Sequence, residues 1–319
     1  MPKWLLYSIL TVLFWGAWGA VSRVLGDSLP GAQSQVISTL GLLPILIILT
    51  SAGHVTAGSV RGCALAFVAG LVGGLGNIAF YHLMSLGEKA VAIVPLTALY
   101  PLVTVALALV LLKERINRVQ SAGVVLALLA MYLFNAGSSG PVKAGVFLQA
   151  LLSIALWGMA GFIQKLSTSH VSGEVSAFWF LLAMVPVAVI LPLVQRFAWR
   201  LPVVTWGWAI VLGLCFGLGN LTLLAAFASG GKASLVAPFC GLYPLVTVPL
   251  AVLFLGERVT LREWTALAVA MAAVAALAFE TQPARPKSPS AEPEGAALNR
   301  DGPRQNPGNA VSQQRPKSD

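Results

Sequence analysis

The heptapeptide LYPLVTV occupies residues 99–105 and occurs again at residues 242–248, 143 positions later. A short apolar segment can recur by accident, but here the flanking residues recur at the same distance. GLGN occurs at 74–77 and at 217–220, and KA occurs at 89–90 and at 232–233. Earlier in the chain the offset is 142, since WG at 15–16 recurs at 157–158. The sequence therefore predicts a duplication, with one copy at residues 1–138 and the other at residues 139–280.

The composition indicates a membrane protein. Of the 319 residues, 57% are hydrophobic and only 10% are charged, whereas soluble proteins carry about 25% charged residues. Residues 91–112 contain no charge, and about 20 apolar residues suffice for a helix to cross the hydrocarbon core. The uncharged runs lack the alternation of a barrel strand, so helices are the remaining way to satisfy the backbone in lipid.

Ten such runs predict an all-α integral membrane protein with ten transmembrane helices. They lie near 4–25, 33–51, 62–83, 91–112, 119–136, 143–164, 175–194, 204–227, 234–255 and 263–280. Each copy then holds five helices, so the second copy enters the membrane from the opposite side. We expect two inverted five-helix repeats, an architecture of secondary transporters whose substrate site lies near midplane between the repeats.

Residues 281–319 differ in character and predict a disordered tail, because they are rich in Pro, Ser, Gly, Asn and Gln. The Lys and Arg residues of the loops divide evenly between the two sides, and the six in the tail favour both termini in the cytoplasm. We therefore expect a multi-pass protein of the cell (inner) membrane. The net charge of +9 follows from helix ends and tail, without the basic stripe that binding to nucleic acid requires.

The sequence shows no motif for a metal, a cofactor or catalysis. Cys63, Cys215 and Cys240 lie in or beside apolar runs without a CxxC pattern, which favours packing thiols. No Asp or Glu falls well inside a predicted span, and His82 is the one candidate proton carrier there. We therefore expect that the protein is not an enzyme. We also expect it to work by facilitated diffusion or solute exchange in preference to proton antiport.

The chain resembles the drug/metabolite transporter superfamily, and within it the EamA-type transporters with five plus five helices. The resemblance rests on WG in the first and sixth helices, on KA followed by P-x4-LYP in the fourth and ninth, and on ER after both. It covers residues 1 to 280 and implies a secondary transporter of a small organic solute, metabolite, amino-acid-like or drug-like, that works by alternating access. A lipid or lipid-sugar flippase of the same superfamily is the alternative, and the protein is expected as a monomer or homodimer.

Polar residues inside the apolar runs are the candidate substrate contacts. Tyr100 and Thr104 share one helical face, as do Tyr243 and Thr247, and this face suits either a small amphipathic solute or hydrogen bonds between helices. Asn77 and Asn220 follow glycine-rich stretches and serve either as cavity groups or as helix contacts. The predicted substrate-binding set is completed by three aromatic residues: Trp15, Tyr81 and Trp157.

The copies differ where a binding site would need asymmetry. Trp18 corresponds to Ala160, Gln35 to Ala177, and Tyr81 and His82 correspond to Leu224 and Ala225. We expect an off-centre solute to lie nearer the more polar residue of each pair.

Two prolines and four cations complete the list. Pro101 and Pro244 fall near the middle of the fourth and ninth helices, where they act as hinges or as static kinks. Arg23, Lys89, Lys165 and Lys232 lie close to helix ends. They either extend to the membrane surface or contact an anionic group of the solute.

Overall fold

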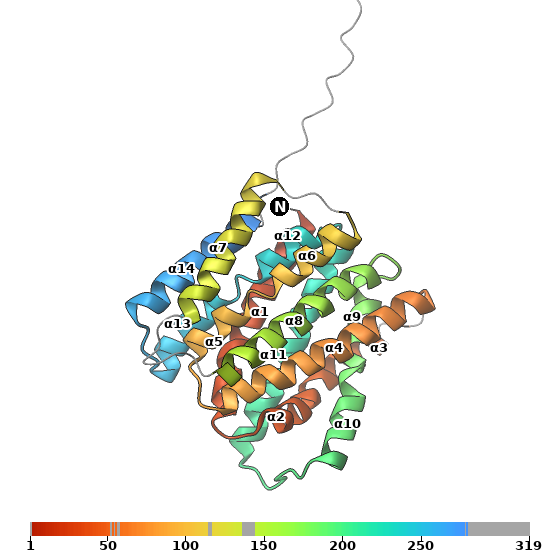
Figure 1. Cartoon of the computed structure of the whole chain (residues 1–319). Coiled ribbons are helices and arrows are strands. Elements are labelled where there is room, and N and C mark those ends of the chain that lie inside the picture. The colour runs from red at the N-terminus through yellow and green to blue at the C-terminus, as the bar shows by residue number, and fades with distance from the viewer. Residues whose placement is uncertain are drawn as a thin grey trace, which may run out of the picture. The chain divides into compact units, whose positions relative to one another are not determined.

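The computed structural model describes residues 2–277 and 279, apart from 52, 54, 56–57, 114–116 and 136–143. These described residues form fourteen α-helices and one 3-10 helix, with no strand (Figure 1). Their bounds are α1 (Lys3–Gly26), α2 (Gly31–Ser38), η1 (Thr39–Leu42), α3 (Leu43–Ser51), α4 (Val60–Ser85), α5 (Ala90–Thr97), α6 (Pro101–Leu111), α7 (Arg118–Asn135), α8 (Ala144–Ser167), α9 (Gly173–Leu182), α10 (Met184–Val194), α11 (Val203–Ala228), α12 (Ala233–Cys240), α13 (Pro244–Leu255) and α14 (Leu261–Leu277). The predicted all-α fold is confirmed for this part of the chain. The tail predicted at 281–319 and the Glu114–Arg115 pair lie outside it.

Eight segments are long and apolar enough to cross a membrane. Four are single helices, namely α1, α4, α8 and α11, and four are composed of shorter helices in sequence, such as α5 with α6 and α12 with α13. The predicted spans near 119–136 and 263–280 are the helices α7 and α14, which are shorter or less apolar in the part that the structure describes. Ten crossings therefore stay a prediction, of which eight have the length and composition required.

The two LYPLVTV segments each contain a break. We expected Pro101 and Pro244 to bend a continuous helix, but each is instead the first residue of a new helix, after a three-residue turn. Proline suits this position because it has no N–H to donate and its φ is already helical. The carbonyl that each proline leaves without a partner accepts from a tyrosine of the turn: Tyr100 N donates to Thr97 O and Tyr243 N to Cys240 O, both at 3.2 Å.

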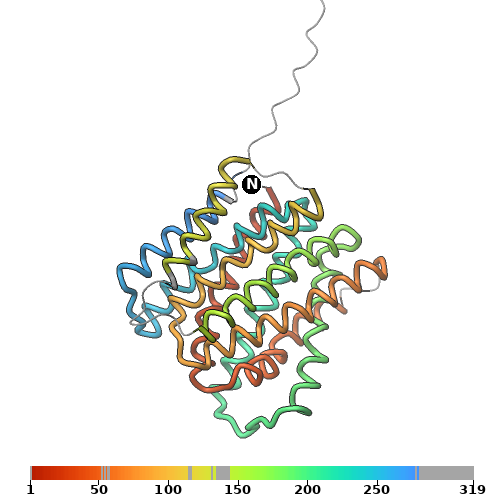
Figure 2. The backbone as a smooth tube through the Cα atoms, in the orientation of Figure 1, coloured from red at the N-terminus to blue at the C-terminus, as the bar shows by residue number. Residues whose placement is uncertain are grey.

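The helices of the two copies pack in reciprocal pairs. Helix α1 packs along α11, and its counterpart α8 packs along α4. Within the broken segments, α5 contacts α13 and α6 contacts α12. The first half of one segment thus lies against the second half of the other, so the two segments run antiparallel. Helices α7 and α14, the last helix of each copy, pack together at one edge (Figures 1 and 2).

A carboxylate of the second copy caps a helix of the first. Glu257, just beyond α13, accepts from the backbone N–H groups of Ala90 and Val91 at 3.0 Å each. These are the first two residues of α5, where backbone donors have no partner within the helix. Arg23 of α1 lies 3.6 Å from the same carboxylate and also pairs with Asp27. This cap between the copies was not predicted from the sequence.

Candidate functional site

A cavity lies between the two copies. Its volume is about 570 Å³, including the open space at its mouth. The walls come from α1, α4, α8 and α11, from α9 and α12, and from the two turns that hold the tyrosines. The lining residues are Trp15, Trp18, Gly73, Asn77, Tyr100, Trp157, Ala160, Gly161, Gln164, Phe180, Phe216, Asn220, Leu223, Phe227, Ala237 and Tyr243.

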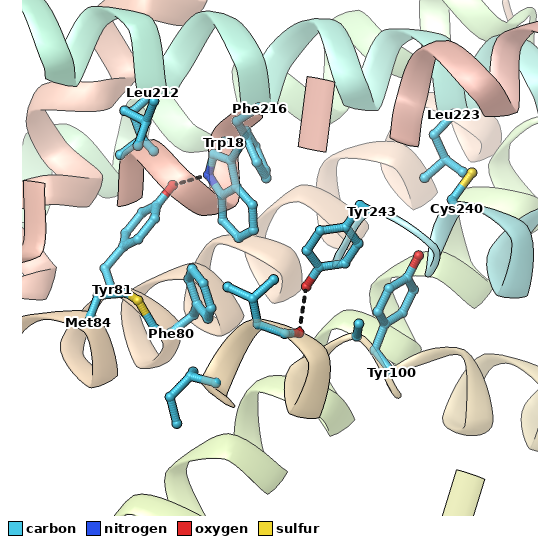
Figure 3. Close-up of a cluster of buried hydrophobic side chains, with 14 of the residues drawn as sticks. Trp18, Phe80, Tyr81, Met84, Tyr100, Leu212, Phe216, Leu223, Cys240 and Tyr243 are labelled. Carbon is cyan, nitrogen blue, oxygen red and sulfur yellow. Dashed lines mark hydrogen bonds between the residues drawn. The ribbon is translucent and has the colours of Figure 1, made fainter. Parts of the chain in front are cut away.

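Aromatic rings in mutual contact form much of this lining. Trp15 presents an edge contact to both Tyr100 and Tyr243, with ring centroids 6.2 Å apart in each case. Trp18 stacks on Phe80 at 4.8 Å and lies 5.6 Å from Trp157. Figure 3 shows Trp18 between Tyr81 and Phe216, with Tyr243 and Tyr100 beyond. Such edge and stacked contacts fix the rings relative to one another, so the cavity wall is preformed.

Two asparagines place amide groups on this wall, and their hydrogen bonds differ. Asn77 Oδ1 accepts from Trp157 Nε1 at 3.0 Å, while Asn77 Nδ2 is buried without a partner among the described residues. Asn220 is satisfied twice: its Oδ1 accepts from Gln164 Nε2 at 3.1 Å, and its Nδ2 donates to the carbonyl of Phe216 at 2.9 Å. Trp15 Nε1, the counterpart of the bonded Trp157 nitrogen, is also buried without a partner. Two residues of the lining therefore each carry a buried N–H donor that has no partner among the residues that the structure describes.

The two turn tyrosines cross between the copies. Tyr100 donates its hydroxyl to the carbonyl of Ala237 in α12, and Tyr243 donates to the carbonyl of Val94 in α5, both at 3.4 Å. The second of these bonds is drawn in Figure 3. Both distances exceed the usual range for an O–H donor, so the bonds are weak. Each turn tyrosine thereby connects the break in its own segment to the first half-helix of the other segment, beside the cavity.

The structure brings together six of the nine predicted substrate contacts: Trp15, Asn77, Tyr100, Trp157, Asn220 and Tyr243. The other three lie outside the lining. Tyr81 accepts from Trp18 Nε1 at 2.8 Å, Thr104 donates to Gly158 O at 2.9 Å, and Thr247 donates to Gly16 O at 2.8 Å. For the two threonines this geometry matches the alternative of hydrogen bonding between helices, and their contact with a solute stays a prediction.

None of the four predicted anion contacts is among the described lining residues. Arg23 is engaged with Asp27 and Glu257. Lys165 donates to the carbonyl of Gly231 at 2.7 Å and lies over the Phe227 ring, 5.7 Å from its centroid. Lys89 and Lys232 are exposed residues immediately before α5 and α12. An anion contact at these cations stays a prediction.

Sequence reasoning left several lining residues out of the site. Gln164 is one of them, although an amide inside an apolar run, opposite Ser22 in the first copy, was a signal that could have found it. Trp18 was noted only as a difference between the copies. Phe180, Phe216 and Phe227 give no such signal, because nothing in an apolar helix separates a cavity phenylalanine from a packed one.

The pattern of the EamA-like transporter family matches the chain twice, at residues 2–136 and 144–279. An uncharacterized protein of Methanocaldococcus jannaschii is 25% identical over 135 residues, which are 98% of that protein and 42% of this chain. That relative is therefore about as long as one copy, which fits a duplication.

A solved structure, described as the crystal structure of a protein, has a similar fold. It superimposes with a TM-score of 0.63 at 19% identity and covers 85% of this chain and 94% of its own. At this identity the likeness concerns the fold alone.

Proposed function

The chain belongs to the EamA-like transporter family, and from that premise we propose that it is a secondary transporter of a small organic solute, working by alternating access between its two repeats. One observation carries the proposal: the aromatic cavity lies between the repeats and takes its walls from both. Solute sites of repeat-built transporters occupy this place. The family also points to a protein without enzymatic activity.

The proposal includes inverted repeats that cross the membrane ten times. The antiparallel packing of α5 and α6 against α13 and α12 supports it, since equivalent helices of inverted repeats run in opposite directions. We place both termini in the cytoplasm of the cell (inner) membrane. The Glu257 cap and its Arg23 partner then lie on the outer side, and Lys165 lies on the inner side.

Pro101 and Pro244 are the proposed hinges. Each starts a half-helix, and a hinge absorbs its change in φ and ψ at such element ends. The weak hydrogen bonds from Tyr100 and Tyr243 link the two hinges. A rocking motion that opens one side of the cavity would break or remake them at small cost. The Glu257 cap between the repeats would have to open whenever the solute leaves on that side.

The proposed solute contacts are the six predicted residues that line the cavity, with Gln164 and Trp18 in addition. Among the described Asp and Glu residues, all lie at helix ends or in connections. A proton relay commonly uses a carboxylate within the membrane. We therefore propose facilitated diffusion or exchange of solute.

The test uses purified protein in liposomes that are loaded with a metabolite extract. Solutes that leave only the protein-containing vesicles are identified by mass spectrometry, and protein-free vesicles give the background. We expect a small set of solutes to leave, and their efflux to speed up when the same solutes are present outside. If no solute leaves but a fluorescent lipid exchanges between leaflets, the transporter proposal is wrong and the flippase alternative takes its place.

A further inference from the structure

The cavity does not follow the symmetry of the two repeats. Five pairs of equivalent residues, such as Asn77 with Asn220 and Tyr100 with Tyr243, supply ten of its sixteen described lining residues. The other six all belong to the second repeat: Gly161, Gln164, Phe180, Leu223, Phe227 and Ala237. The cavity therefore extends from its centre toward one end only, which we call the Gln164 end.

The opposite end of the cavity is filled. The six residues have first-repeat counterparts at the repeat offsets of 142 and 143, namely Gly19, Ser22, Ser38, Phe80, Met84 and Val94. All of these counterparts are buried, and none is among the described lining residues. We call this closed side the Ser22 end. On α1 it leads to the next residue, Arg23, and to the Glu257 cap.

One pair of equivalent residues accounts for the difference between the ends. Trp18 of α1 occupies the position that Ala160 has in α8. One helical turn further along, Gln164 lines the cavity and its counterpart Ser22 does not. Residues one turn apart share a helix face, so the lining of α8 continues past the small Ala160 side chain. The lining of α1 stops at the Trp18 indole.

Two aromatic neighbours hold this indole in place. Trp18 Nε1 donates to the Tyr81 hydroxyl at 2.8 Å, and the ring stacks on Phe80 at 4.8 Å between centroids (Figure 3). The second repeat has Leu223 and Leu224 at the positions of Phe80 and Tyr81. It therefore lacks both the ring at Ala160 and the partners that would fix such a ring.

Building on the proposed alternating access, we infer that Trp18 is the gate at the Ser22 end of the cavity and that Tyr81 is its positioning residue. The indole separates the cavity from Ser22 and from the Glu257 cap beyond. A solute that leaves by this end has to displace the ring. At the Gln164 end only the methyl group of Ala160 lies at the equivalent point, so the two ends close by different means.

The reaction of single cysteines with N-ethylmaleimide tests the closed end without a solute. Ser22→Cys and Gln164→Cys are made in the full chain with Cys63, Cys215 and Cys240 replaced by alanine, and are purified in detergent. Each rate is divided by the rate of the same variant unfolded in dodecyl sulfate. We expect Gln164→Cys to react about tenfold faster than Ser22→Cys, because a packed site reacts only on local opening. Equal rates overturn the inference.

Trp18→Ala tests the gate itself. We expect the reaction of Ser22→Cys to become about tenfold faster, because opening no longer has to break the contacts of a buried indole. Trp18→Phe keeps a ring and should accelerate the reaction less. Trp179→Ala is the matched control, because it removes an indole that is not among the described lining residues. Equal acceleration by Trp18→Ala and Trp179→Ala would mean general loosening of the helices and would contradict the gate.

Tyr81→Phe tests the positioning role and also decides if Trp18→Ala does not fold. It keeps the ring of residue 81 and removes the hydroxyl that accepts from Trp18. We expect Ser22→Cys to react about threefold faster, as for the loss of one average hydrogen bond between membrane helices. The rate of Gln164→Cys should stay the same, whereas a merely structural role would raise both rates. An unchanged Ser22→Cys rate refutes the positioning role.

Ala160→Trp is the converse change, because it places an indole at the equivalent point of the open end. We expect the reaction of Gln164→Cys to slow about tenfold, since the cysteine then reacts only when the new ring moves. An unchanged rate in the folded variant would show that a ring at this position does not close an end of the cavity.

The inference and the proposed function fail in different ways. The cysteine rates are measured without solute, so liposomes that release no solute would refute transport and leave the closed Ser22 end standing. Cysteine rates that contradict the gate leave the transport proposal standing, because the efflux assay does not depend on which residue closes the cavity.

Discussion

The indole nitrogen of Trp157 lies 3.0 Å from Oδ1 of Asn77, which joins α8 of the second repeat to α4 of the first. The equivalent residues, Trp15 and Asn220, make no such bond: Asn220 Oδ1 accepts from Gln164 instead. The helices around the cavity therefore follow the repeat, whereas the hydrogen bonds that line it do not. Such asymmetry predicts that a solute bound in the cavity would take a single orientation.

Trp157→Phe tests this cross-repeat bond. The substitution removes the donor and leaves Asn77 with both polar atoms unpaired. We therefore expect a loss of about 0.6 kcal/mol, the average for hydrogen bonds between membrane helices, and of about 1.7 kcal/mol at most. Thermal unfolding in detergent measures it. Trp15→Phe is the control, because the nitrogen it removes has no partner in the described part of the chain, and it should cost less. Equal losses in the two variants would mean that the bond adds nothing.

Gly158→Ala tests the contact between α8 and α6. A Cβ at this position would lie 2.8 Å from the Tyr100 carbonyl and against the Val103 side chain, so one of the helices must shift. Overpacking of this kind costs about 1–3 kcal/mol. Gly145→Ala in the same helix is the control, because no residue that the structure describes lies within 4 Å of its Cβ, and it should be neutral or slightly stabilising. Thermal unfolding of both variants provides the comparison.

Glu257→Gln tests the cap between the repeats. The amide loses the charge that interacts with the α5 N-terminus and with Arg23, so we expect a loss of about 1–2 kcal/mol at low salt. Glu174→Gln is the control: Glu174 is an exposed acid in the first turn of α9. Thermal unfolding at low and high salt should show a larger loss of stability for Glu257→Gln than for Glu174→Gln. Salt should reduce the loss less for Glu257, because this carboxylate is less exposed. The cap is unimportant if the two variants lose the same stability.

The repeat is the reason why so much of the fold could be predicted from the sequence. Two copies of one pattern give the same helix boundaries twice, and a composition this apolar leaves helices as the spanning element. The breaks before Pro101 and Pro244 were harder to predict. Proline alone indicates a bend, whereas the full break depends on the turn hydrogen bonds of Tyr100 and Tyr243.

The partners of side chains could not be predicted, because they depend on which helices meet. Tyr100 and Thr104 share a face in sequence, yet Tyr100 reaches the cavity and Thr104 bonds to the Gly158 carbonyl of α8. The same holds for Glu257, which follows α13 in sequence and caps α5 in space. Which helices of the two repeats meet decides the partners of these side chains. The periodicity of apolar residues in one helix does not predict which other helix it contacts.

Inversion of the repeats predicts opposite membrane sides for equivalent residues. Lys89 and Lys232 are equivalent, exposed and immediately before α5 and α12. Single cysteines at these positions, with Cys63, Cys215 and Cys240 replaced by alanine, should react with an impermeant maleimide from opposite sides of oriented vesicles. We expect Lys89→Cys to react from outside and Lys232→Cys from inside. Reaction of both from one side would contradict the inverted arrangement.

The hinge role of Pro101 and Pro244 predicts a change in rate without a change in binding. Alanine restores an N–H and a helical preference at the break, so each half-helix can extend into the turn and stiffen it. We expect Pro101→Ala and Pro244→Ala to slow solute efflux from liposomes about tenfold, which corresponds to about 1.4 kcal/mol in the barrier of the conformational step. Affinity for a solute found by the liposome assay should change little, because Tyr100 and Tyr243 keep their rings on the cavity wall. Pro249→Ala is the control, since this proline lies inside α13, away from the break, and its equivalent in the first repeat is Ala106. Efflux that slows as much in Pro249→Ala as in the other two would assign the effect to general helix stiffness, and the prolines at the breaks would then be static.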